Sequence, residues 1–138
     1  MKIKLAHLVV VFLGFGVLSS LARADEITLE KARPVVIKSV PESGADAVSP
    51  DTTEISVTFS KPMKAGSWSW AMLDKESYPG TNEPPKYLED KKTCVLPVKL
   101  QPGKTYAVWI NSEKLAGFKD TKEQPAVPYL LVFKTREK

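Results

Sequence analysis

Short runs of alternating apolar and polar residues recur along this chain of 138 residues. The clearest run covers residues 54–60, where Ile55, Val57 and Phe59 share one face and polar residues share the other. A period of two is typical of a β-strand with one face on a core and one face in water. The same criterion predicts further strands at residues 35–40, 67–72, 92–100, 106–110 and 129–135, and a short edge strand at 87–88.

Turn-forming residues separate these runs. Pro, Gly, Ser and Asp cluster at residues 41–45 and 49–52, and a Pro-Gly pair follows at residues 102–103. About seven short strands without a helix of useful length predict an all-β fold, an antiparallel β-sandwich. Because Pro97 has no N–H to donate, the run at 92–100 is expected to lie at a sheet edge or to carry a bulge.

Two tryptophans allow two interpretations of the run at residues 67–72. Trp68, Trp70 and Met72 fall on the same face of this run, and the two indoles could form a platform on which a sugar ring stacks. Tyr78 and Tyr87 flank the loop that follows and could contact a ligand; the alternative is that they cover the open edge of the sandwich. The alternative is that at least one indole fills the core, which is favoured because burying an indole is strongly stabilising.

The segment at residues 111–128 is long, polar and without a clear period. Connections of this length without regular structure are uncommon in compact domains and are usually functional or disordered. Lys114 and Phe118 give the segment mixed basic and apolar character, so we expect it to form the main contact surface, together with the 78–87 loop. The alternative is that Leu115 and Phe118 cap the end of the core.

The N-terminus differs in composition from the rest of the chain. Lysines occupy two of the first four positions, an almost uninterrupted apolar stretch covers residues 8–21, and Ala-Arg-Ala ends at residue 24. This pattern is typical of a secretory signal peptide, and the stretch is short for a bilayer span. We therefore expect a signal peptide at 1–24, a lead-in at 25–33 and one domain at 34–136, in the periplasm or outside the cell, without a membrane span in the mature chain. An uncleaved anchor is the less favoured alternative.

Removal of the signal peptide would change the chemistry of the chain. The formal charge would fall from +4 to about +1, with 17 basic residues against 16 acidic ones, and the charges are interspersed. A nucleic-acid partner therefore has little support. The only histidine, His7, would be lost, which excludes nucleophilic catalysis by Ser-His or Cys-His pairs and any His-ligated metal site. No cofactor or metal ion is expected, and Cys94, the only cysteine, is expected to be a buried thiol.

Four short motifs follow one another in a fixed order. They are P-x-x-G-A-x-x-V-S-P-D-T at residues 41–52, I-x-V-x-F-S-x-P-M at 55–63, L-x-P-G-x-x-Y at 100–106 and F-x-T at 133–135. Together they resemble bacterial Ig-like domains of the S-layer SbsA type. The resemblance implies an immunoglobulin-like sandwich in which Tyr106 forms a tyrosine corner, hydrogen-bonding to the backbone just upstream.

The resemblance also implies a function. Such domains usually occur as spacer or adhesion modules of exported proteins, which implies a non-enzymatic module whose partner is a protein or a surface polymer. A carbohydrate-binding module that uses Trp68, Trp70, Tyr78 and Tyr87 is the alternative. The pattern is also similar to that of periplasmic copper carriers of the CopC type, but their copper site uses histidines, and residues 25–138 contain none. A small hydrolase or a metal carrier therefore has the least support.

Overall fold

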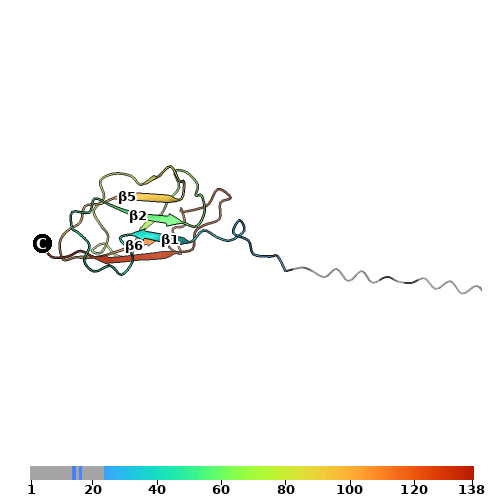
Figure 1. The fold of residues 1–138 in the computed structure, drawn as a ribbon, viewed down its shortest axis with the longest axis horizontal. Helices are drawn as coiled ribbons and strands as arrows, with labels where there is room; N and C mark the ends of the chain where they lie inside the picture. Colours follow the sequence, from blue (N-terminus) through green and yellow to red (C-terminus); the bar gives the residue numbers. More distant parts are fainter. Residues whose placement is uncertain (1–13, 15, 17–23) are drawn as a thin grey trace, which may run out of the picture.

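The computed structural model describes residues 14, 16 and 24–138. The signal peptide predicted for residues 1–24 therefore lies almost entirely outside the described residues. From residue 34 onward the chain forms two packed antiparallel sheets (Figure 1). Figure 1 also shows that residues 24–33 leave the sandwich at one end, whereas the C-terminus lies at the opposite end.

Seven strands make up the two sheets. The first sheet has the order β1-β2-β5-β4, with β1 at Val36–Val40, β2 at Glu54–Phe59, β5 at Thr93–Pro97 and β4 at Lys86–Tyr87. The second has the order β3-β6-β7, with β3 at Trp70–Met72, β6 at Thr105–Ile110 and β7 at Tyr129–Lys134. Constant-type immunoglobulin domains have this strand order. The predicted fold class is confirmed.

The core lies between the two sheets and follows the predicted alternation. Ile55, Val57 and Phe59 of β2 are fully buried, as are Val108 and Ile110 of β6. Their neighbours along each strand point to the outer face, because successive side chains of a strand alternate in direction. The inward faces of the seven strands together hold one continuous apolar cluster.

The predicted tyrosine corner is present at the start of β6. The hydroxyl oxygen of Tyr106 accepts a hydrogen bond of 2.8 Å from the backbone N–H of Gln101, and the Tyr106 side chain is buried. Its ring lies 5.5 Å from that of Phe133, measured between ring centres. The corner therefore joins the turn before β6 to the core.

Two strand predictions need correction. The run at 67–72 is regular only from Trp70, which is buried, and Met72 is 58% exposed, so Trp68, Trp70 and Met72 do not share one buried face. The run at 92–100 is not an edge strand, because β5 pairs with both β2 and β4. Pro97 is the last residue of β5 and lies beyond Val95, which pairs with Lys86 at the start of β4, so its missing N–H breaks no hydrogen bond with β4.

The predicted lead-in is tied to the domain. The Nζ of Lys61 donates to the carbonyl oxygens of Glu30 at 2.7 Å and Ala32 at 3.0 Å. Arg33 donates to the carbonyls of Pro125 and Ala126. The chain therefore enters the sandwich beside the connection between β6 and β7.

Candidate functional site

The connection between β6 and β7, residues 111–128, is closed at its base by one side chain. Asn111 is fully buried, and its Nδ2 donates to the carbonyls of Phe118 at 2.9 Å and Ala126 at 3.0 Å. Its Oδ1 accepts from the N–H of Phe118 at 2.9 Å. The backbone of Asn111 has a φ of 57°, a left-handed conformation in which Asn is enriched. Asn111 thus links the parts of the loop at Phe118 and Ala126 to the end of β6.

Phe118 lies in the core rather than on the surface. Its ring is fully buried, 5.0 Å from the ring of Phe59 and 5.6 Å from that of Trp70, between centres. The prediction that Phe118 belongs to a binding surface is wrong for this structure, because the polar loop folds back and inserts the ring between the sheets. The alternative, that Phe118 caps the core, describes it correctly, whereas Leu115 is 55% exposed.

Gly117 fixes the loop against the segment that leads into β3. Its N–H donates to the Oγ of Ser69 at 2.7 Å, and its carbonyl accepts a hydrogen bond from the Oγ of Ser67. A Cβ at this position would lie 2.4 Å from the carbonyl oxygen of Trp68. The close approach of the two backbones therefore requires glycine here.

An ion pair with little solvent access anchors the second half of the loop. The Nζ of Lys61 lies 3.1 Å from the Oδ2 of Asp120, whose side chain is 2% exposed. Burial raises the pKa of the Asp120 carboxyl, but N–H groups of Gln124 and Lys122 and the charge of Lys61 outweigh burial, so the pKa lies below its usual value. The carboxylate thus stays charged and connects the loop to Lys61 and, through it, to the lead-in.

These anchors leave residues 112–115 projecting as a loop tip. The N–H of Ser112 donates to the carbonyl of Leu115 at 2.8 Å, and the N–H of Leu115 donates to the Oγ of Ser112 at 3.1 Å. The side chains of Glu113 and Lys114 are exposed. Within residues 24–138 neither of them forms a hydrogen bond or an ion pair, so both are free to meet a ligand.

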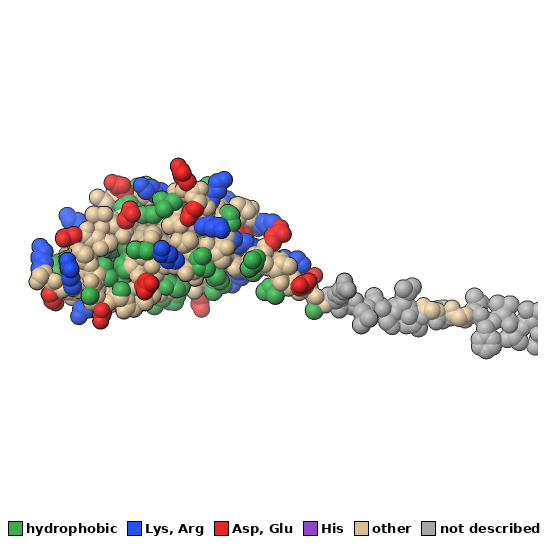
Figure 2. Space-filling view, viewed as in Figure 1, with side chains coloured by type: hydrophobic (Ala, Val, Ile, Leu, Met, Phe, Trp, Pro, Cys, Tyr) green, Lys and Arg blue, Asp and Glu red, His purple; other side chains and the backbone are tan. Residues whose placement is uncertain are grey.

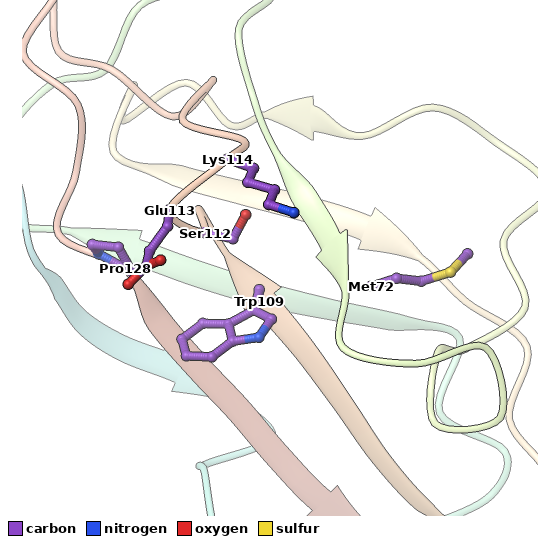
Figure 3. A pocket seen from close by; sticks show the side chains of 6 residues that line it. All are labelled: Met72, Trp109, Ser112, Glu113, Lys114 and Pro128. Atoms are coloured by element: carbon purple, nitrogen blue, oxygen red, sulfur yellow. The ribbon is translucent and has the colours of Figure 1, made fainter.

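One hollow lies beside the loop tip on the outer face of the β3-β6-β7 sheet. We call it the Trp109 hollow; its volume is about 390 Å³, and it is lined by Met72, Trp109, Ser112, Glu113, Lys114 and Pro128 (Figure 3). Because Val108 and Ile110 point into the core, Trp109 between them points outward. Its indole is partly exposed, in line with Ala71 of β3 and Leu130 of β7.

A second hollow lies on the other side of the loop tip. We call it the Trp68 hollow; its volume is about 430 Å³, and it is lined by Trp68, Ser69, Trp70, Tyr78, Thr81, Glu83, Pro84, Pro85, Leu96 and Leu115. It brings together three of the predicted binding residues, Trp68, Trp70 and Tyr78. Trp70 is only 9% exposed, so the pair of indoles does not form an open platform.

The two predicted tyrosines hold the segment before and within β3. Tyr78 donates its hydroxyl hydrogen to the carbonyl of Trp70 at 3.0 Å, and Tyr87 donates to the carbonyl of Ser67 at 2.8 Å. Burial raises the pKa of both hydroxyls, and for Tyr87 the neighbouring Cys94 adds to this effect. Both hydroxyls therefore remain protonated and act as donors. Tyr87 lines neither the Trp109 hollow nor the Trp68 hollow.

The structure thus divides the six predicted binding residues. Lys114 lines the Trp109 hollow, three others line the Trp68 hollow, Tyr87 holds the segment before β3, and Phe118 is in the core. Sequence reasoning missed Trp109, although the period of two around the buried Tyr106 would have placed it on the outer face.

Other chemistry at the surface is sparse. On the face shown in Figure 2, acidic and basic side chains alternate with hydrophobic ones. Across the part of the chain that the structure describes, no three His, Cys, Asp or Glu side chains gather to hold a metal ion. No helix among the described residues is long and apolar enough to cross a membrane.

Comparisons with known proteins identify relatives at the level of the domain. A family model described as "Bacterial Ig-like domain" matches residues 30–135. Among solved structures, the S-layer protein rSbsC(31-844) is 23% identical over 76% of this chain, with a TM-score of 0.48. Domains 1-6 of the surface layer protein SbsC are 22% identical over 78% of this chain, with a TM-score of 0.49. In both cases this chain spans 14% of the length of the other. No curated protein matches this chain.

Proposed function

Because the chain belongs to the family of bacterial Ig-like domains, we propose that it is an exported, non-enzymatic module that binds a protein or a polymer of the cell surface. The observation that carries this proposal is the loop tip with a hollow on either side of it. Loops held in place by a rigid sandwich are common positions for binding residues. The tip at 112–115 is such a loop, since Asn111 and Gly117 fix it on both sides.

Exposed apolar residues support this location of the contact surface. Met72 and Leu115 line the two hollows and are 58% and 55% exposed. Leu73 and Val127, the neighbours of lining residues, are also exposed. Single exposed apolar residues are ordinary, but a group of them around a hollow is typical of an interaction surface.

The proposals on export and on processing rest on the sequence. The charged start, the apolar stretch and Ala-Arg-Ala support removal of residues 1–24, which leaves a lead-in at 25–33 and the domain at 34–136. The expected location is the periplasm or the cell exterior. The intact mass of the exported protein should correspond to a chain that begins at Asp25, and a mass that retains Met1 would contradict export by cleavage.

The absence of histidine beyond residue 7 supports a non-enzymatic role. The common nucleophilic mechanisms need a base beside a serine or cysteine, and histidine is the usual base. Cys94, the only thiol, is fully buried. Within residues 24–138 neither a histidine base nor an exposed thiol is available, which supports a binding role.

The experiment is sedimentation of the exported protein with cell envelopes from its own source. We expect the wild-type protein to sediment with the envelopes and the Met72→Ser, Leu115→Ser double variant to remain in solution. Leu88→Ser is the matched control, because Leu88 is similarly exposed at 45% but lines neither hollow. Absence of binding, or equal binding by all three proteins, would overturn the proposal.

A further inference from the structure

We propose that the Trp109 hollow binds a pyranose ring of a neutral surface polysaccharide, with the sugar stacked on the indole of Trp109. This inference rests on the proposed function and names the class of its partner. It moves the sugar site away from the tryptophan pair of the Trp68 hollow, where one indole is buried.

The first argument is the setting of the indole. Trp109 lies on β6, the middle strand of its sheet, directly opposite Ala71 of β3 and Leu130 of β7. In Figure 3 its ring is seen face-on, with no backbone segment in front of it. The face of an aromatic ring carries partial negative charge, so it attracts the weakly positive C–H groups on the apolar face of a sugar.

The second argument is the set of polar groups beside the ring. Glu113 offers a carboxylate acceptor, Lys114 offers an ammonium donor, and both side chains lack an internal partner within residues 24–138. The Oγ of Ser112 accepts from the N–H of Leu115, so its own hydrogen remains free to donate. Sugar hydroxyls both donate and accept, and therefore match a site that presents donors and acceptors together. The opposite charges of Glu113 and Lys114 favour a neutral sugar over a charged one.

The third argument is the kind of surface on which the hollow lies. Extended peptides bind sheets mainly by adding a strand to a free edge, where unpaired backbone groups are available. β6 has no free edge, because it pairs with β3 on one side and with β7 on the other. Around Trp109 the hollow therefore offers a ligand side-chain chemistry, which favours a sugar over an extended peptide. Its volume of about 390 Å³ lies within the usual range for small-ligand sites.

The experiment is titration of the exported protein with three neutral oligosaccharides, namely cellotetraose, mannotetraose and tetra-N-acetylchitotetraose, followed by NMR. We expect at least one of them to bind and to shift the indole N–H signal of Trp109. Trp109→Ala should weaken this binding by about tenfold or more, and Trp109→Phe should restore part of it. Trp68→Ala in the other hollow is the matched control and should bind as the wild type does.

A variant of the loop tip keeps the test independent of folding. Glu113→Gln lies on an exposed tip, so it leaves the core intact, and it should weaken binding of the same oligosaccharide. Binding of none of the three sugars, or unchanged binding by Trp109→Ala, would overturn the sugar site. The protein could still sediment with envelopes and lose this binding when the envelopes are treated with protease. In that case the proposed function stands with a protein partner, and the sugar inference fails.

Discussion

The hydroxyl of Tyr106 and the backbone N–H of Gln101 are joined by a hydrogen bond of 2.8 Å across the turn before β6. Tyr106→Phe would remove the acceptor and leave that N–H without a partner. We expect the free energy of unfolding to fall by about 0.5–1.5 kcal/mol in urea denaturation, the usual net contribution of one hydrogen bond, because this bond is only partly buried. A loss below about 0.5 kcal/mol would show that this hydrogen bond does not stabilise the corner.

Gly117→Ala should disturb the loop tip. The added Cβ would meet the carbonyl oxygen of Trp68 at 2.4 Å, and backbone cannot give way as a flexible side chain can. We expect a loss of about 1–3 kcal/mol in unfolding free energy, as for other overpacked sites. Gly80→Ala is the control, since its nearest contact would be an ordinary 3.5 Å. Equal stability of the two variants would argue against the close approach at Gly117.

Asp120→Asn should reduce stability at neutral pH and weaken its dependence on acid. The folded pKa of Asp120 is lowered, so its contribution is complete above the unfolded pKa of about 3.9 and is lost as the pH falls through the folded value. At pH about 7 we expect the variant to be less stable by about 1–3 kcal/mol, because Lys61 loses its charged partner.

Urea denaturation between pH about 7 and about 2.5 measures this effect. The difference between Asp120→Asn and the wild type should shrink toward the acid end, as the wild-type carboxyl takes up a proton. Glu123→Gln is the control and should change little, because its ion pairs with Lys64 and Lys119 are exposed. A difference in stability that stays constant with pH would contradict the conclusion that the charged carboxylate of Asp120 stabilises the fold.

Cys94 should resist alkylation in the folded protein. Burial raises the pKa of its thiol to about 12, an effect that the indole N–H of Trp70 and the N–H of Val95 only partly offset. The indole N–H of Trp70 forms no hydrogen bond of ordinary geometry, so it is a weak influence. Iodoacetamide at pH about 8 should modify Cys94 only after unfolding in urea, as intact mass would show. Rapid labelling of the folded protein would indicate that the core opens around this thiol.

The sandwich was predictable because several strands are apolar on one face only. Ile55, Val57 and Phe59 alternate with polar residues, and all three are buried as expected. The outward direction of Trp109 was harder to predict, because both faces of β6 carry apolar residues. The alternation there identifies a strand, and only the burial of Tyr106 in the predicted corner marks its inner face, from which the period of two places Trp109 on the outer face.

The loop at residues 111–128 was predicted only in part. Its length and its lack of a regular period were evident from the sequence, but the burial of Phe118 was not. That burial depends on Asn111, whose side chain joins backbone groups seven and fifteen residues further along the chain. Such contacts have no local sequence signature. The polar composition of the loop therefore gave no indication that Phe118 lies in the core.

Photo-crosslinking in cells that export the protein tests the central claim most directly, namely that the loop tip meets the partner. A photoreactive amino acid at Leu115, on the tip, should crosslink to a component of the cell envelope. The same group at Asp51 should not, because Asp51 lies in an exposed turn at the end of the sandwich that carries the C-terminus. Crosslinks from Asp51 alone, or equally from both positions, would contradict a contact surface at the loop tip.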